Sequence, residues 1–478
     1  MKGGTMYKLK GKILVVLSII GILAVLSYAY GYKYPRPESM KFKSLEFKPK
    51  EPTRIELDNG VILYLLENHE LPLIEGYAYI KAGSVYDPED KVGLARLTAE
   101  VMRTGGTKSM SGDEINDELE YNAAYVEMGA SADLAFASFS TLKENLDHVI
   151  QIYADILMNP IFDREKLVIA KEKLKEEIRR QNDRPMQIAF REFFKRVTKG
   201  HPIGWYPTLE SVDNIQREDL IDFHRQYYHP NNVILAVAGD FNTSEFISKL
   251  NKVFDGWPKV TIDFPKIPDL ELEYGKKVYY AEKDVTQSTI VLGHVGIHQK
   301  EPSYYPLYVG NYILGRGMNS RLFKEVRTKA GLAYAVGSFL SGGQLYRGIC
   351  AAYCLTKSAT TGKAIDLILD EIKRLRKEKV SDEELQDAKD GIINRFVFKF
   401  TSALQIARNK AAIEYYGLPP DYYDKYRDHI RAVTADDILE VAQKYLHPDN
   451  VEIMVVGKEA DFDKPLSSYG EVEEIKLE

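Results

Sequence analysis

The chain has 478 residues, which is too long for a single hydrophobic core and predicts two or more domains. Its hydrophobic fraction of 45% and charged fraction of 28% are ordinary for a globular protein. The formal net charge of −6 is mild for this length and gives no reason to expect a nucleic-acid partner.

The first thirty residues differ in kind from the rest. Four lysines among the first twelve residues precede an uncharged run from Ile13 to Tyr30. Ser27 and Ala29 form a small-x-small pattern that an export peptidase cuts after Ala29. Left uncut, the run spans roughly 27 Å as a helix, which is enough for a membrane anchor.

The lysines that precede this run predict that the rest of the protein, which follows the run, lies outside the cytoplasm. We therefore expect residues 1–35 to be an export signal or membrane anchor, and the protein to be periplasmic or anchored to the cytoplasmic membrane. A buried core helix is the alternative. An arginine-rich mitochondrial transit peptide fits poorly, because the first arginine is Arg36.

The next segments predict strands followed by a short helix. The run "RIELDNGVILYLLE" at 54–67 predicts a β-hairpin turned at Asp58-Asn59-Gly60, and "IEGYAYIKAG" at 74–83 predicts a third strand. The stretch "GLARLTAEVMRTGGT" at 93–107 predicts a helix closed by a glycine turn. Its apolar stripe comprises Leu94, Leu97, Thr98 and Val101, and its other side comprises Arg96, Glu100 and Arg103.

Further helices follow, two of them with recognisable starts. Ser111 with Glu114, and Thr141 with Glu144, form possible capping boxes. The helix after Thr141 is predicted to end before Pro160, and a long charged helix runs from 163 to about 182. The apolar face of the helix after Thr141 comprises Leu146, Val149, Ile150, Tyr153 and Leu157. "NVILAVAGDF" at 232–241 predicts a buried strand.

The chain then repeats itself at a fixed distance. A shift of 218 residues aligns Leu167, Ala170, Lys171, "QIA" at 187–189, His229, Pro230, Asn232, Val233 and Gly239 with Leu385, Ala388, Lys389, "QIA" at 405–407, His447, Pro448, Asn450, Val451 and Gly457. One ungapped offset over about 70 residues indicates a tandem duplication of an α/β unit of about 200 residues.

This pattern predicts an α+β fold in which each unit is a mostly antiparallel sheet with helices packed on one face. The two domains are predicted at 36–257 and 276–478. The segment 258–275 contains three prolines and no helical period, so we interpret it as the linker.

The two cysteines, Cys350 and Cys354, lie in "GICAAYC". On a strand they would stand roughly 13 Å apart, which is too far for a disulfide bond. We interpret them as buried, small apolar residues.

Several motifs carry a resemblance to a known family. The N-terminal unit contains "AGSVYD", "GLA", "ADILMNPIF", "KEEIRRQNDRP", "HPIGW" and "YYHPNNVILAVAGDF", and the C-terminal unit contains "NSRLFKEVRTKAGLAYAVGSFLS". From about Thr53 to Glu459 the chain resembles the pitrilysin/insulinase family of zinc peptidases, in the branch that includes the mitochondrial processing peptidase.

The resemblance implies a zinc site that this chain has lost. Active members carry HxxEH on the helix after "AGS", where two histidines and a distant glutamate hold the metal and the other glutamate activates water. The corresponding residues here are Arg96, Ala99 and Glu100, with Glu177 as the distant glutamate. A guanidinium offers only donors and a methyl group cannot accept a proton, so we predict that this chain binds no metal and is inactive alone.

We further predict that Arg96 replaces the positive charge of the metal and pairs with Glu100 and, across the fold, with Glu177. The alternative is that Arg96 and Glu100 only face solvent.

The resemblance also implies that Arg327 and Tyr334 bind the scissile carbonyl and its developing oxyanion, acting in a partner's site. The alternative is that both are structural. The segments "GASADLAFASFS" and "AVGSFLSGGQLY" fall where the family has sheet edges that accept a peptide as an added strand, although ordinary strands are the alternative.

The function implied by the resemblance is that of a non-catalytic, substrate-binding subunit of an exported heterodimeric zinc metallopeptidase acting on peptides. The partner subunit would carry HxxEH and supply the zinc. One alternative is an inert structural or binding protein of the same fold, like the core proteins of a respiratory complex. Another is a peptidase with an unconventional metal site.

Overall fold

The computed structural model describes residues 49–272 and 274–477, and Pro49–Glu478 form one compact unit. The export signal or anchor predicted over residues 1–35 lies outside the described residues. Within the described ranges, no helix combines the length and the apolar character needed to cross a membrane.

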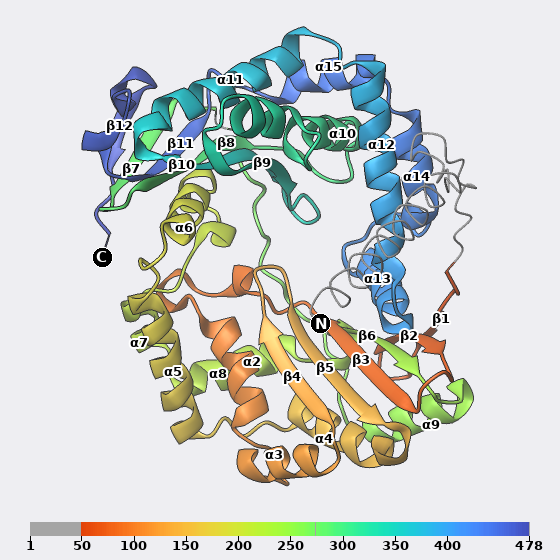
Figure 1. The fold of residues 1–478 in the computed structure, drawn as a ribbon. Coiled ribbons are helices and arrows are strands. Elements are labelled where there is room, and N and C mark those ends of the chain that lie inside the picture. Colours follow the sequence, from red (N-terminus) through yellow and green to blue (C-terminus); the bar gives the residue numbers. More distant parts are fainter. Residues whose placement is uncertain (1–48, 273, 478) are drawn as a thin grey trace, which may run out of the picture. The chain divides into compact units, whose positions relative to one another are not determined.

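The N-terminal half is built on a six-stranded sheet with the strand order β1-β2-β6-β3-β5-β4 (Figure 1). The strands are β1 (Thr53–Glu56), β2 (Ile62–Glu67), β3 (Leu73–Ile80), β4 (Tyr125–Ala130), β5 (Ala135–Leu142) and β6 (Val233–Gly239). Neighbouring strands are antiparallel except for β2 and β6. The predicted hairpin is confirmed as β1 and β2, and Gly60 in its turn has φ +95°, a conformation that favours glycine.

The C-terminal half repeats this arrangement, with the strand order β12-β7-β11-β8-β10-β9. The strands are β7 (Lys277–Glu282), β8 (Gln287–Val295), β9 (Ala333–Ser341), β10 (Ile349–Lys357), β11 (Glu452–Gly457) and β12 (Glu471–Glu474). The parallel pair β11 and β7 matches the pair β6 and β2. The two sheets differ in the direction of one outermost strand. Strand β1 is antiparallel to β2, whereas β12 is parallel to β7.

The helices follow the same duplication. In the N-terminal half they are α2 (Leu94–Thr104), α3 (Gly112–Tyr121), α4 (Leu146–Met158), α5 (Arg164–Arg179), α6 (Pro185–Val197), α7 (Leu209–Asn214), α8 (Arg217–Tyr227) and α9 (Thr243–Val253). In the C-terminal half they are α10 (Tyr304–Gly315), α11 (Thr361–Lys377), α12 (Asp382–Phe396), α13 (Ala403–Tyr415), α14 (Tyr422–Ala432) and α15 (Ala435–Tyr445). The pairs α5/α12, α6/α13 and α8/α15 each begin 218 residues apart, so the predicted tandem duplication is confirmed.

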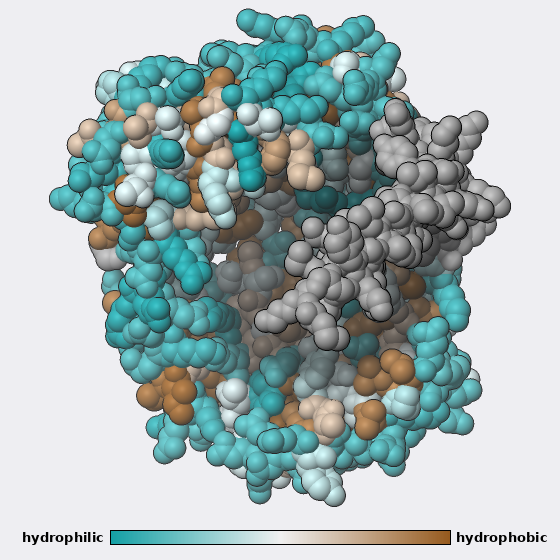
Figure 2. Space-filling model, in the orientation of Figure 1, coloured by the Kyte–Doolittle hydropathy of each residue, from teal (hydrophilic) through white to brown (hydrophobic). Residues whose placement is uncertain are grey.

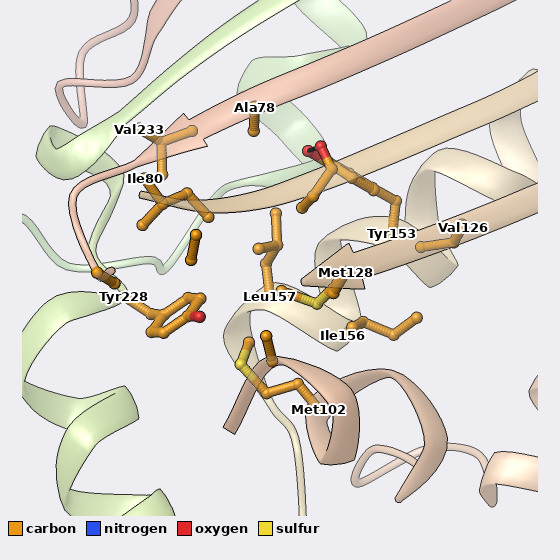
Figure 3. Packing of buried hydrophobic residues seen from close by; sticks show 14 of the residues in the cluster. Ala78, Ile80, Met102, Val126, Met128, Tyr153, Ile156, Leu157, Tyr228 and Val233 are labelled. Atoms are coloured by element: carbon orange, nitrogen blue, oxygen red, sulfur yellow. Dashed lines mark hydrogen bonds between the residues drawn. The ribbon is translucent and has the colours of Figure 1, made fainter. Parts of the chain in front are cut away.

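The core of the N-terminal half lies between its sheet and its own helices. Met102 of α2 and Leu157 of α4 lie beneath Ala78 and Ile80 of β3 (Figure 3). The predicted apolar stripes of α2 and α4 are buried. The face of the molecule in Figure 2 is mostly hydrophilic, with hydrophobic residues in small separate patches.

The second face of each sheet is covered by a helix from the other half, which the sequence analysis did not predict. Ala407 and Ala411 of α13 pack on the N-terminal sheet, beside Ala236 and Ala238 of β6. Conversely, α6 packs on the C-terminal sheet (Figure 1). The helices of each half do cover one face of its own sheet, as predicted.

One predicted helix start is wrong. Ser111 and Glu114 form the predicted capping box, but Thr141 lies inside β5 and its hydroxyl donates to the carbonyl oxygen of Leu142 at 3.2 Å. A helical turn over Lys143–Asn145 leads into α4 instead.

The linker carries no helix or strand over 258–272, but it is anchored. Ile262, Phe264 and Ile267 pack against the N-terminal core, and the Phe264 ring lies 5.7 Å from that of Tyr86. The linker is therefore part of the N-terminal half's surface rather than a loose tether.

The two cysteines are buried on β10 and do not form a disulfide, as predicted. Burial raises the pKa of each thiol to about 12, so both stay protonated at neutral pH.

Candidate functional site

Helix α2 carries three of the four positions at which the resemblance implies a zinc site, namely Arg96, Ala99 and Glu100. It begins after Gly93, which has φ +112°, and the carboxylate of Asp87 accepts hydrogen bonds of 2.8 Å from the amides of Gly93 and Ala95. Burial raises the pKa of Asp87 to about 7 even though these amides favour the charged form. Asp87 thus fixes the first turn of α2, a role that the sequence analysis missed.

The predicted pair between Arg96 and Glu177 is present. Arg96 Nη2 lies 2.9 Å from Glu177 Oε1 and 2.7 Å from Oε2, which joins α2 to α5. The two side chains are 38% and 48% exposed, so the pair lies at the surface between the helices and not inside the core.

The predicted pairing of Arg96 with Glu100 is wrong. Glu100 Oε1 instead accepts a hydrogen bond of 2.9 Å from Lys173 on α5. Two ion pairs therefore join α2 and α5, with the cation on α2 in one pair and on α5 in the other. The two pairs can form side by side because Lys173 precedes Glu177 by four residues, just as Arg96 precedes Glu100. That matched spacing is present in the sequence, but the proximity of α2 and α5 that makes it meaningful is not.

These residues do not fit a zinc ion. The guanidinium of Arg96 has no lone pair to offer, and both carboxylates already have a cationic partner. Ala99 is fully buried and carries no proton acceptor. Across the described parts of the chain, no three His, Cys, Asp or Glu side chains are grouped so that they could hold a metal ion.

Arg103, on the same side of α2, has a structural position. Its Nε donates to the carbonyl oxygen of Val126 at 2.5 Å and its Nη1 to Asn116 Oδ1 at 2.9 Å. It thereby ties α2 to β4 and α3.

Arg327 lies on a π-helix, η7 (Phe323–Lys329), which sequence patterns did not predict. The amide of Ala330 donates to the carbonyl oxygen of Glu325 at 3.0 Å, the wider spacing of such a helix. Arg327 is exposed, and its guanidinium lies 4.9 Å from the centre of the Phe323 ring.

The start of this helical segment is anchored by a buried arginine. Arg321 is 5% exposed at its side chain and forms two hydrogen bonds to the carboxylate of Glu384 on α12, at 2.7 and 2.9 Å. These bonds hold the pKa of Glu384 down at about 2. Arg321 thus fixes the segment from which Arg327 extends.

Tyr334 lies at the start of β9, a few residues after the end of η7, and it is 75% exposed. η7 and β9 pack against each other, so the structure places Arg327 and Tyr334 on neighbouring elements of one half. Arg96 and Glu177 belong to the other half.

The two segments predicted at sheet edges have different positions. The segment "AVGSFLSGGQLY" includes β9, which is the edge strand of the C-terminal sheet. The prediction for "GASADLAFASFS" is wrong for most of its length, because β5 lies between β3 and β4. Only Gly129 and Ala130 of that segment belong to the true edge strand, β4.

Two family models match the chain. One described as "Insulinase (Peptidase family M16)" matches residues 77–205, and one described as "Peptidase M16 inactive domain" matches residues 214–392. A crystal structure of a peptidase M16 inactive domain from Pseudomonas fluorescens has a TM-score of 0.79 and 25% identity, covering 87% of this chain and 100% of its own.

The names of similar proteins differ in the activity that they state. An "Uncharacterized zinc protease" of Rickettsia felis is 27% identical over 403 residues, covering 81% of this chain and 93% of that protein. A "Non-peptidase homolog YmxG" of Helicobacter pylori is 21% identical over 393 residues, covering 82% and 90%. The similarity therefore includes both zinc proteases and a protein named as lacking that activity.

Proposed function

The chain belongs to the insulinase family of peptidases, family M16, and on this basis we propose that it is the non-catalytic subunit of a heterodimeric zinc peptidase. A partner of the same family supplies HxxEH and the zinc. This chain binds peptide substrate and places Arg327 and Tyr334 in the partner's active site.

The observation that carries the proposal is the contrast between the two halves. In the N-terminal half, Arg96 and Glu177 are bound to each other, Glu100 is bound to Lys173, and Ala99 carries no proton acceptor. In the C-terminal half, Arg327 and Tyr334 are exposed and present two hydrogen-bond donors of the kind that stabilise a developing oxyanion.

The inert structural or binding protein remains the second candidate, and the name of the Helicobacter pylori relative favours it. The exposure of Arg327 and Tyr334 on neighbouring elements supports the subunit, because an oxyanion role needs both side chains to be accessible. The two candidates therefore differ in what a change at Arg327 does.

The test mixes this chain with an HxxEH relative from the same genome, chosen first from neighbouring reading frames, and follows the cleavage of unstructured peptides. We expect activity only in the mixture, and a loss of about 100-fold in kcat with Arg327→Ala, as for removal of one oxyanion donor. Lys324→Ala is the matched control, because Lys324 is an exposed cation on the same helical segment.

Full activity of the Arg327→Ala mixture would overturn the oxyanion role. An HxxEH relative that binds this chain without becoming active would favour the inert protein. Zinc analysis of the two purified chains then checks that the metal belongs to the partner.

We also propose that residues 1–35 direct export, so that the complex acts outside the cytoplasm. The lysines followed by the uncharged run Ile13 to Tyr30 support this proposal. Cell fractionation and the mass of the mature N-terminus test it, and an uncut chain in the cytoplasm would contradict it.

A further inference from the structure

A cavity of about 250 Å³ lies where the turn between β4 and β5 meets the loop between β9 and β10. Ser131 and Gly342 border it and are exposed, so the cavity opens to solvent. Sites for whole cofactors or drug-sized ligands are usually larger, about 300–1,000 Å³, so this cavity suits a single side chain of a ligand. Its apolar wall comprises Phe194, Ile203, Leu270 and Ile349.

One carboxylate at this cavity lacks a cationic partner. Asp133 borders the cavity, and its Oδ1 accepts a short hydrogen bond from the hydroxyl of Tyr346. Among the residues that the structure describes, none forms an ion pair with Asp133 or a hydrogen bond to its Oδ2. Burial raises the pKa of Asp133, because its charge is partly removed from water. A cation that enters the cavity would offset this cost.

Arg347 borders the same cavity, but its charge is already balanced. Its Nη1 lies 2.5 Å from Asp269 Oδ2 and donates to the carbonyl oxygen of Leu270 at 2.9 Å. Asp133 and Arg347 are the only charged residues among the described residues that line the cavity. Because Asp269 balances Arg347, the charge left over at the cavity is the negative charge of Asp133.

His201 does not balance Asp133 either. Its ring lies beside that of Tyr346, with the two centres 5.0 Å apart, and its Nδ1 accepts a hydrogen bond of 3.1 Å from the amide of Ile203. An accepting Nδ1 carries no proton, and burial lowers the pKa of His201. The ring is therefore uncharged at neutral pH.

The groups around the cavity are held in place before any ligand binds. The backbone carbonyl oxygen of Asp133 accepts a hydrogen bond of 2.7 Å from the hydroxyl of Tyr415, and Tyr346 is buried. The amide of Arg347 donates to Asp269 Oδ1 at 2.9 Å. A ligand therefore meets a carboxylate that is already positioned, which reduces the cost of binding.

We propose that this cavity is a subsite for a lysine side chain of the peptide substrate, with the ammonium group at Asp133 Oδ2 and the aliphatic stem against Phe194 and Ile349. A lysine side chain combines an apolar stem with a compact charge, as the apolar wall and the single free oxygen require. Arginine fits less well, because a guanidinium binds both oxygens of a carboxylate and Tyr346 already occupies one. The inference rests on the proposed function in taking a peptide as the ligand.

Binding of two labelled peptides to the purified chain alone tests the subsite. Both are unstructured and otherwise uncharged, and they differ only in one central residue, which is lysine or norleucine. Norleucine keeps the aliphatic stem and lacks the ammonium group, so the comparison isolates the charge. By fluorescence anisotropy we expect the lysine peptide to bind about tenfold more tightly than the norleucine peptide, and more tightly than an arginine peptide.

The variant Asp133→Asn assigns this preference to one residue. An amide keeps the shape of the side chain and an acceptor for Tyr346 but has no charge, so the lysine peptide should bind as weakly as the norleucine peptide, whose affinity should not change. Asp117→Asn is the matched control, because it removes an exposed carboxylate on α3 and should keep the tenfold difference.

Equal binding of the lysine and norleucine peptides to the unaltered chain, or a preference that survives Asp133→Asn, would overturn the subsite. An arginine peptide that binds as tightly as the lysine peptide would overturn the preference for lysine. These results do not depend on an HxxEH partner, so the subsite can fail while the mixture of subunits is active. A lysine preference that depends on Asp133 would stand even with an inactive mixture. If no peptide binds, both the subsite and the peptide-binding role are wrong.

Discussion

Arg96 and Glu177 form an ion pair in which each partner keeps more than a third of its side chain in contact with solvent. Such pairs contribute about 1 kcal/mol or less to folding. The buried residues Leu97 and Val101 hold α2 in place instead. We therefore propose that the pair matters less for stability than for placing a fixed side-chain charge at the position where the resemblance implies a metal.

At the scale of the residue, histidines can be placed at the two positions of α2 where the resemblance implies metal ligands. The double variant Arg96→His/Glu100→His gives two imidazoles one helical turn apart and frees Glu177, so we expect about one zinc per chain by metal analysis after dialysis. No peptide cleavage should appear, because Ala99 still supplies no base.

Adding Glu177→Gln to that double variant is the control and should abolish zinc retention, since an amide is a much poorer ligand. Zinc retained by the unaltered chain, or none retained by the double variant, would contradict our view of this site.

At the scale of the element, an ion pair anchors the start of the segment that carries η7. The Arg321–Glu384 pair lowers the pKa of Glu384 from 4.5 to about 2. A carboxylate whose pKa is lowered by folding stabilises the protein above pH 4.5, and this stability is lost as the pH falls from 4.5 towards 2. Because Glu384 is partly exposed, we discount the full effect to about 2 kcal/mol.

We therefore expect Glu384→Gln to lower the free energy of unfolding by about 2 kcal/mol at pH 7 and by much less near pH 2.5, measured by urea titration at each pH. Glu383→Gln, at the exposed neighbouring position, should behave like the unaltered chain at both pH values. A pH-independent difference for Glu384→Gln would show that the ionised pair is not its cause.

Helical period and capping patterns sufficed for α2, α3 and α5, because burial and end-capping act within a few residues. The same pattern failed at Thr141, whose neighbours favour a buried strand over a helix start. The π-helix around Arg327 has no sequence signature of its own. Lys173 was missed because the sequence gives its spacing from Glu177 and not the distance from α2 to α5.

At the scale of the whole molecule, the exchange of α6 and α13 makes each half incomplete. Residues 49–257 alone would expose Ala236 and Ala238, and residues 276–478 alone would expose Val291 and Met454. Ile188 and Phe193 are apolar in the sequence, but apolar residues in a helix do not say which sheet that helix covers. The duplication was predictable, and the exchange was not.

We expect residues 49–257 and 276–478 to aggregate when produced separately and to form a one-to-one complex when co-expressed, measured by tagged co-purification and size-exclusion chromatography. Phe193→Asp in the first fragment should prevent association, because Phe193 is fully buried on the other half's sheet. Lys199→Ala, at an exposed site just after α6, should have no effect. Soluble, monomeric separate fragments would contradict the importance of the exchange.

The position of α13 in the chain has a consequence during synthesis. The last strand of the N-terminal sheet ends at Gly239, yet the helix that covers this sheet ends only at Tyr415. At a translation rate of about 5–20 residues per second, the interval is roughly 9 to 35 s. During that time the N-terminal sheet of the nascent chain exposes the apolar face that α13 later covers. We therefore expect chaperones to bind this face until the C-terminal half has been synthesised.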